Sequence, residues 1–135
     1  MINLKIVDNR HWRTTYMNSD YKVGDLIYDA NIYDAMNTNL DDLYFYKRWL
    51  PKNKDARILE LCCGTGRLTL PIAKEGYDIT GVDYTPSMLA QAKMKASEAG
   101  LEISFIEADI RTLNLPEKYD LISVSYTHLT LPTKR

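Results

Sequence analysis

Residues 57–67 read Arg-Ile-Leu-Glu-Leu-Cys-Cys-Gly-Thr-Gly-Arg, and they set the architecture of the chain. Their apolar first half has the length and the bounds of a buried strand. Gly64 and Gly66 then allow a sharp turn and a close approach of the backbone to a ligand. A helix is predicted over 67–75, and Gly76 follows where a left-handed C-cap is favoured. A strand, a glycine turn and a helix in this order begin a βαβ unit.

The same alternation continues toward the C-terminus. Further strands are predicted over 77–83 and 101–106, with a helix between them, and a fourth strand is predicted over 118–123. Strands and helices that alternate at this spacing form right-handed crossovers and a parallel sheet. The expected fold is therefore Rossmann-like, doubly wound α/β, and such a sheet binds ligands at the carboxyl ends of its strands.

The helix between the second and third strands has clear boundary signals. Thr85 is a candidate N-cap, Pro86 suits the first helical position, and Gly100 ends the helix. The predicted apolar stripe consists of Leu89, Ala92, Ala96 and Ala99. The nearby lysines, Lys93 and Lys95, are interpreted as part of a solvated helix face.

Three segments are expected along the chain. Residues 1–50 are a helical N-terminal extension, 51–123 are the N-terminal part of the α/β domain, and 124–135 are a foreign tail. Within the extension, 41–50 is predicted to be a helix, because Leu43, Tyr46 and Leu50 follow helical spacing and Pro51 stops it. The aromatic residues of that helix, Tyr44, Phe45, Tyr46 and Trp49, are interpreted as helix packing.

Composition narrows the function classes. The charged fraction of 26 % and the ten tyrosines argue against disorder. The formal net charge of -1 provides no general electrostatic footprint for nucleic acid, with a local basic patch as the open alternative. Adjacent Cys62 and Cys63 are the only cysteines, so they form neither a disulfide framework nor a zinc site and are interpreted as packing residues. His11 and His128 lack partners at ligand spacing, so no metal is expected. We expect a soluble cytoplasmic protein without a membrane span.

Three acidic residues stand at the predicted strand ends. Glu60 lies in the first strand, Asp83 ends the second, and Asp109 follows the third. A carboxylate after the second strand accepts hydrogen bonds from ribose hydroxyls in dinucleotide-binding folds. Taken singly, Glu60 also fits a salt-bridging carboxylate, Asp83 a strand terminator and Asp109 an ordinary turn residue.

Taken together, these positions resemble the class I S-adenosylmethionine-dependent methyltransferases. The resemblance spans residues 58–122 and consists of five pieces in order. They are E-x-x-x-G-x-G at Glu60–Gly66, G-V-D at Gly81–Asp83, T-P-x-M-L at Thr85–Leu89, A-D-I at Ala108–Ile110 and Y-D-L-I at Tyr119–Ile122.

The resemblance implies that S-adenosyl-L-methionine binds at the strand ends. The residues that it assigns to the cofactor are Glu60, Cys62, Gly64, Gly66, Asp83, Tyr84, Met88, Asp109 and Ile110. Upstream, Tyr28-Asp29 and Tyr33-Asp34 resemble the tyrosine-bearing N-terminal helix of small-molecule methyltransferases, and this second resemblance adds Tyr33. One departure is that many family members have glycine where Cys62 stands, and we expect a residue as small as cysteine to be tolerated.

Each part of the cofactor has implied partners. Glu60 would orient the turn and the methionine amino group, the backbone at Cys62 and Gly64 would face the methionine part, and Tyr33 would reach its carboxylate. Asp83 would hold the ribose. Tyr84 and Met88 would pack on the ribose or the adenine. Asp109 would accept from the adenine amine, and the Ile110 N–H would reach a ring nitrogen.

The expected activity is methyl transfer to a small-molecule acceptor, with protein or RNA acceptors as open alternatives. Positioning of an activated methyl group requires no covalent enzyme nucleophile, and no catalytic residue is assigned. One alternative is a cofactor-binding or inactive fragment. Another is a nucleotide-dependent oxidoreductase, whose G-x-G-x-x-G fingerprint would need glycine where Thr69 stands.

The last segment departs from the family pattern. Residues 124–133, Val-Ser-Tyr-Thr-His-Leu-Thr-Leu-Pro-Thr, resemble a translated transposase-type sequencing adapter, and the alternative is a natural short C-terminus. With the tail excluded, the resemblance implies an incomplete sheet of about four of seven strands. The expectation is a marginally stable, aggregation-prone and inactive fragment.

Overall fold

The computed structural model describes residues 29–36, 38 and 40–124. Most of the predicted extension before α3, and the predicted tail from residue 125 onward, lie outside the described residues. The elements in chain order are α3 (Ala30–Met36), α4 (Asp41–Lys47), β1 (Arg57–Leu61), α5 (Thr69–Lys74), β2 (Asp78–Asp83), α6 (Pro86–Glu98), β3 (Ser104–Glu107) and β4 (Leu121–Val124).

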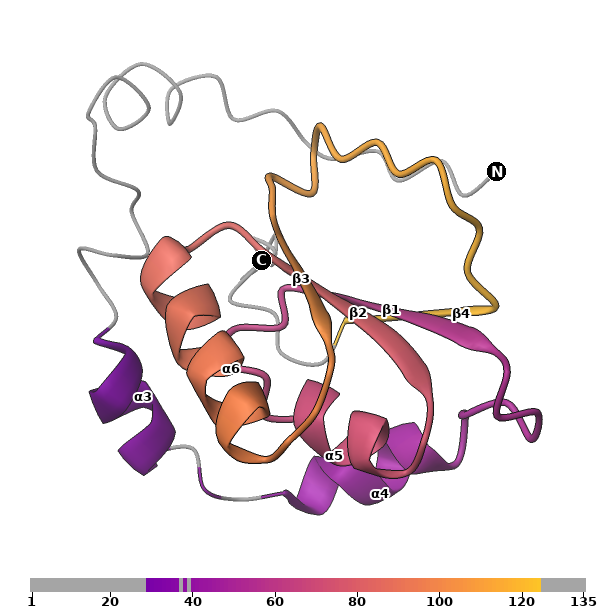
Figure 1. Ribbon diagram of the computed structural model, residues 1–135, viewed down its shortest axis with the longest axis horizontal. Helices are drawn as coiled ribbons and strands as arrows, with labels where there is room; N and C mark the ends of the chain where they lie inside the picture. The colour runs from indigo at the N-terminus through magenta and orange to yellow at the C-terminus, as the bar shows by residue number, and fades with distance from the viewer. Residues whose placement is uncertain (1–28, 37, 39, 125–135) are drawn as a thin grey trace, which may run out of the picture.

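The four strands form one parallel sheet in the order β3-β2-β1-β4 (Figure 1). Ile58 of β1 lies opposite Ile79 of β2 on one side and opposite Leu121 of β4 on the other. The predicted Rossmann-like α/β fold is confirmed. Because the order reverses at β1, the carboxyl ends of β1 and β4 border the crevice in which such sheets bind ligands.

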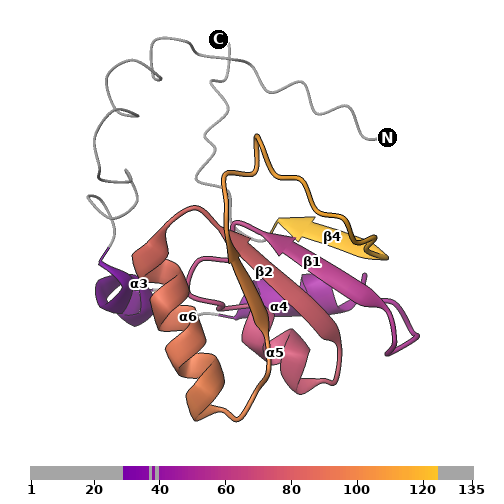
Figure 2. The same cartoon turned by 45° about the horizontal axis from the view of Figure 1, so that its top comes forward.

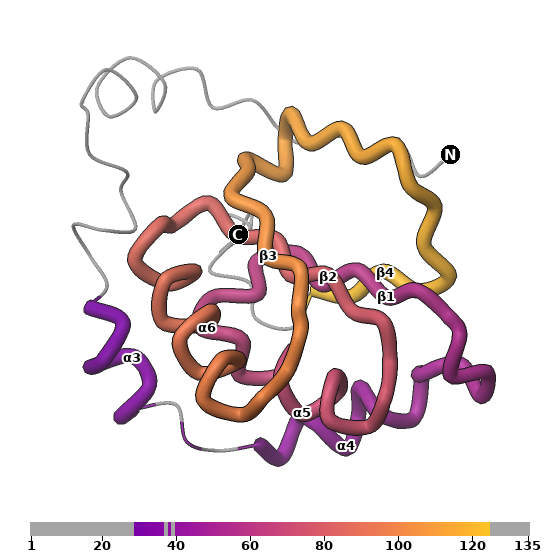
Figure 3. The backbone as a smooth tube through the Cα atoms, in the orientation of Figure 1, coloured from indigo at the N-terminus to yellow at the C-terminus, as the bar shows by residue number. Residues whose placement is uncertain are grey.

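The helices α3, α4, α5 and α6 lie on one side of the sheet in Figures 1 and 2. Ile58, Ile72 and Ile79 form a core cluster beneath them, and Leu43 and Leu50 pack against it. The backbone trace in Figure 3 shows how 108–120 carries the chain from β3 at one edge of the sheet to β4 at the other.

Glycines end the helices as predicted, but the start of α6 differs. Gly76 and Gly100 take φ angles of 91° and 66° after α5 and α6, which are left-handed values. Thr85 occupies the N-cap position of α6 without a capping side-chain hydrogen bond. Its N–H donates to Asp83 Oδ1 at 2.8 Å, a contact that fixes the residue before the helix but does not cap the N–H groups of the first turn.

Two predictions about exposure are wrong. Ala99 is exposed at the C-cap of α6, and Met88 joins the buried stripe in its place. Three of the four aromatic side chains in and after α4 are largely exposed: Tyr44 at 77 %, Phe45 at 59 % and Trp49 at 67 %. Helical periodicity therefore predicted the buried faces of these helices, but it did not predict that large aromatic side chains would be exposed on the outer face.

Among the described residues, no helix has both the length and the apolar character that a membrane crossing requires.

Candidate functional site

The turn after β1 has three residues with left-handed backbone. Cys62, Gly64 and Gly66 have φ angles of 57°, 56° and 78°, and Cys62 is the one non-glycine with positive φ in the described part of the chain. A Cβ on Gly66 would lie 2.5 Å from Leu70 Cδ1, the end of a half-buried side chain that would have to move aside. A Cβ on Gly64 would meet nothing within 4 Å. The backbone at Gly64 therefore borders open space that a ligand could occupy.

Asp83, at the end of β2, joins this turn to the next helix. Its side chain is buried, with 9 % of the residue exposed. The Gly64 N–H donates to Oδ2 at 2.8 Å, and the Thr85 N–H donates to Oδ1. A carboxylate accepts about four hydrogen bonds, so acceptor capacity is left on both oxygens. The Asp83 carbonyl also accepts from the Ala108 N–H at 3.0 Å, which brings the segment after β3 to the same place.

Glu60 is buried in β1, where Thr69 Oγ1 at the start of α5 donates to its Oε2. Arg67 lies close enough for Glu60 and Tyr33 to raise the pKa of its guanidinium electrostatically, after the larger effect of its hydrogen bonds to Asp42. Tyr33 itself is half-buried on α3. The structure thus brings two predicted methionine-side residues to the same neighbourhood as the turn.

The predicted adenine side is less open. Asp109 accepts from its neighbour Arg111, whose Nε lies 2.8 Å from Oδ1 and 2.9 Å from Oδ2, and whose backbone N–H also donates to Oδ1. The sequence analysis did not predict the pairing of Asp109 with Arg111. Tyr84 and Ile110 are half-buried, while Met88 is buried on α6 and leaves little surface for a ligand.

The two thiols lie beside two carboxylates. Burial, and then the charges of Asp83 and Glu60, raise the pKa of Cys62 to about 11. Burial and the same charges, with Glu60 ahead of Asp83, raise the pKa of Cys63 still further. Both side chains are therefore protonated thiols at neutral pH, which makes them poor nucleophiles.

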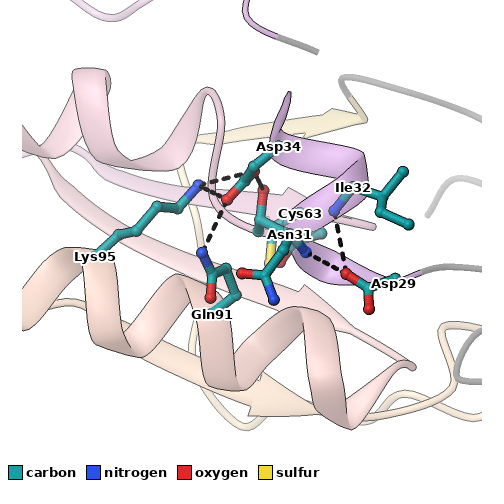
Figure 4. Close-up of polar contacts among 9 residues, drawn as sticks. Asp29, Asn31, Ile32, Asp34, Cys63, Gln91 and Lys95 are labelled. Carbon is teal, nitrogen blue, oxygen red and sulfur yellow. Dashed lines mark hydrogen bonds and ion pairs between the residues drawn. The ribbon is translucent and has the colours of Figure 1, made fainter. Parts of the chain in front are cut away.

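Sequence reasoning missed a polar cluster beside the turn. Asp34 of α3 accepts hydrogen bonds from Gln91 and Lys95 of α6 (Figure 4). It also accepts one from Thr65 of the turn. The interpretation of Lys95 as a solvated lysine is therefore wrong, whereas Lys93 is exposed. No sequence signal links residues so far apart in the chain.

The chain is similar in sequence to known methyltransferases. The model of a family described as "Methyltransferase domain" matches residues 58–135. The chain is 35 % identical over 103 residues to a demethylmenaquinone methyltransferase of Thermus thermophilus, covering 70 % of this chain and 47 % of that protein. It is 41 % identical over 63 residues to a 23S rRNA (uracil(1939)-C(5))-methyltransferase of Shewanella halifaxensis, covering 46 % of this chain and 14 % of that one.

The fold is also similar to that of a methyltransferase of known structure. The S-adenosylmethionine-dependent methyltransferase of Thiobacillus denitrificans, in complex with S-adenosyl-L-homocysteine, aligns with a TM-score of 0.59 and 25 % identity over 70 % of this chain and 41 % of that chain. The chain thus spans less than half the length of each of these relatives.

Proposed function

The chain belongs to the class I S-adenosylmethionine-dependent methyltransferases, and from this premise we propose that its strand-end site binds S-adenosyl-L-methionine for methyl transfer to a small molecule. The observation that carries the proposal is the Asp83 carboxylate. It is buried, it is held by two backbone N–H groups, and it keeps acceptor capacity next to the open space at Gly64.

The ribose and methionine parts have fitting partners. Asp83 accepts hydrogen bonds from the two ribose hydroxyls. The open backbone at Cys62 and Gly64 faces the methionine part, while Gly66 permits the tight packing of the turn. Glu60 orients the turn and the amino group, and the Tyr33 hydroxyl binds the carboxylate.

The adenine part requires a local exchange. Asp109 loses a hydrogen bond that Arg111 donates, and its freed oxygen accepts from the exocyclic amine of the adenine. The Ile110 N–H donates to a ring nitrogen of the adenine. Tyr84 packs on the ring, with a smaller contribution from the exposed edge of Met88.

The cofactor supplies an activated methyl group, so the residues of this chain bind, orient and exclude water. The raised pKa values keep Cys62 and Cys63 protonated, which supports a reaction without a thiolate nucleophile. Cys62 and Cys63 are free thiols, and on this ground we place the protein in the cytoplasm.

Two observations favour a small-molecule acceptor over RNA. The match to the demethylmenaquinone enzyme extends over 70 % of this chain, against 46 % for the rRNA enzyme. The formal net charge of -1 provides no positive excess for phosphate groups.

Titration of the chain with S-adenosylhomocysteine tests the cofactor site. Asp83→Asn keeps the shape of the side chain but removes its charge and one acceptor oxygen. We expect the affinity to fall at least about tenfold, because hydrogen bonds to charged groups contribute about 1.5–3 kcal/mol. Asp78→Asn, at the other end of β2, is the matched control and leaves the affinity unchanged.

Equal affinities of the two variants would remove the ribose assignment. NADH that displaced S-adenosylhomocysteine at comparable concentration would favour the oxidoreductase alternative. The acceptor class is tested with methyl-labelled S-adenosylmethionine offered together with a quinol-type small molecule or with 23S rRNA. Label that entered the RNA alone would refute the small-molecule proposal, and label in neither acceptor would favour the alternative of an inactive fragment.

A further inference from the structure

We infer that Asp34 is a positioning residue, which holds helix α3 and its Tyr33 over the cofactor-binding turn. The inference rests on the proposed function and adds a residue that neither the family resemblance nor the glycine motif assigns. The Asp34 latch is defined as Asp34 with its three donors, Thr65, Gln91 and Lys95.

The latch joins three elements through one carboxylate. Thr65 Oγ1 donates to Asp34 Oδ1 at 2.5 Å, and Gln91 Nε2 donates to Oδ2 at 3.2 Å. Lys95 Nζ lies 3.1 Å from Oδ1 and 3.0 Å from Oδ2. In Figure 4, Gln91 and Lys95 point from α6 toward Asp34 on α3. They are four residues apart, so one face of α6 presents both donors.

Thr65 makes the latch part of the cofactor site. It stands between Gly64 and Gly66 and is fully buried. Asp83 therefore holds the turn through the Gly64 N–H, while Asp34 holds it through the next side chain. A contact that fixes the turn and α3 together reduces the ordering that a ligand must impose on binding.

Polar contacts are what keep α3 in place. None of its residues is buried, and Ile32 and Met36 are 60 % and 78 % exposed. The half-buried side consists of Ala30, Tyr33 and Asp34, which share one helical face. Loss of the Asp34 contacts therefore leaves Tyr33 on a helix with little apolar contact to hold it.

The position of the ion pair makes it stronger than an ordinary surface pair. The side chains of Lys95 and Asp34 are 27 % and 25 % exposed, so water screens them less than it screens fully exposed charges. A carboxylate that accepts from three separate side chains also forms a network, whose members support one another.

The test compares four variants: Asp34→Asn, Lys95→Met, Lys95→Arg and the matched control Lys93→Met. Lys93 lies on the same helix and is exposed. Two quantities are measured for each full-length variant, the affinity for S-adenosylhomocysteine and the hydrogen-exchange rates of the amides in α3, β1 and β2. The strand amides report whether the domain remains folded.

We expect Asp34→Asn and Lys95→Met to weaken binding about tenfold and to speed exchange in α3 but not in the strands. Lys95→Arg keeps the cation and restores the affinity to within about threefold of the unsubstituted chain. Lys93→Met changes neither quantity. A purely structural role would slow or speed exchange in the strands and in α3 together.

Equal behaviour of Lys95→Met and Lys93→Met in both measurements would overturn the latch, as would a loss of binding with α3 exchange unchanged. If the unsubstituted chain does not bind S-adenosylhomocysteine, the proposed function fails. The exchange comparison then decides separately whether Asp34 holds α3.

Discussion

At the residue scale, the two glycines of the turn have different physical constraints. Gly66→Ala would place a Cβ 2.5 Å from Leu70 Cδ1 on a left-handed backbone. The strain of the left-handed backbone, together with the shift that Leu70 must make, should lower the free energy of unfolding by about 2 kcal/mol. Gly64→Ala is the matched control, because its backbone is also left-handed but its Cβ meets no atom within 4 Å. Its cost should be about 1 kcal/mol.

Urea denaturation of both variants measures these differences. Equal destabilisation would mean that backbone conformation alone, and not the contact with Leu70, makes glycine necessary at position 66.

A second residue-scale prediction concerns Cys62, whose raised pKa suppresses the thiolate. At pH 8.5, a pKa of about 11 in place of 9.0 should slow its reaction with a thiol reagent by a factor on the order of 50 to 100 relative to the unfolded chain. A Cys63→Ala background isolates the Cys62 signal. Labelling as fast in the folded chain as in urea would contradict the prediction.

The raised pKa of Cys62 also predicts that the stability of the folded chain falls at high pH. A group whose pKa is higher in the folded state binds more protons there, so the contribution of Cys62 is fully present below pH 9.0. It is lost as the pH rises through about 11.

At the element scale, the ion pair between Arg67 and Asp42 fixes α4 to the glycine turn. Arg67 Nη1 and Nη2 donate to the two oxygens of Asp42 at 2.7 and 2.6 Å. The hydrogen bond from Arg67 is the largest effect on the pKa of Asp42, and the net result is a lowered pKa. The pairing therefore stabilises the folded state above pH 3.8, and this stability is lost as the pH falls through the lowered pKa.

Asp42→Asn should lower the free energy of unfolding by about 1 kcal/mol at pH 7, a modest value because Asp42 is 37 % exposed and water screens the pair. The difference from the unsubstituted chain should shrink as the pH falls below 3.8. Asp41→Asn, in the same first turn of α4, controls for the effect of a charge at the helix N-terminus. A deficit for Asp42→Asn that stayed constant down to low pH would show that the ion pair is not its cause.

At the scale of the whole molecule, an apolar groove lies between α4 and β4. Its volume is about 350 Å³, and its lining residues are Phe45, Tyr46, Trp49, Leu50, Ile72 and Leu121 to Val124. Ile122 is 53 % exposed at this edge of the sheet. Exposed apolar surface of this kind promotes association. We therefore expect this groove to be the surface through which the chain aggregates.

Trp49→Lys should reduce the fluorescence enhancement of the apolar dye ANS by about half and raise the soluble concentration of the chain. Met94→Lys on α6 is the control, because Met94 is 47 % exposed and does not line the groove. If both substitutions reduced dye binding equally, the groove would not be the main apolar surface.

The sequence by itself determined the parallel sheet, the glycine turn and the acidic residues at the strand ends. Those features depend on short-range properties: a buried strand reads as an apolar run, and glycine and proline mark turns and helix ends. The same local pattern placed Leu43 of α4 on the inner face. It predicted the helix three residues too long, because α4 ends at Lys47 and Leu50 packs against the core from the turn that follows.

Only the tertiary structure decided which distant polar groups meet. Asp34 contacts Thr65 and Lys95, which lie 31 and 61 residues further along the chain, and Arg67 pairs with Asp42 across 25 residues. Such partners have no fixed spacing in the sequence, because the crossovers and the packing of α3 and α4 bring them together. A lysine that looks solvated in the sequence therefore becomes a contact of the candidate site in the folded chain.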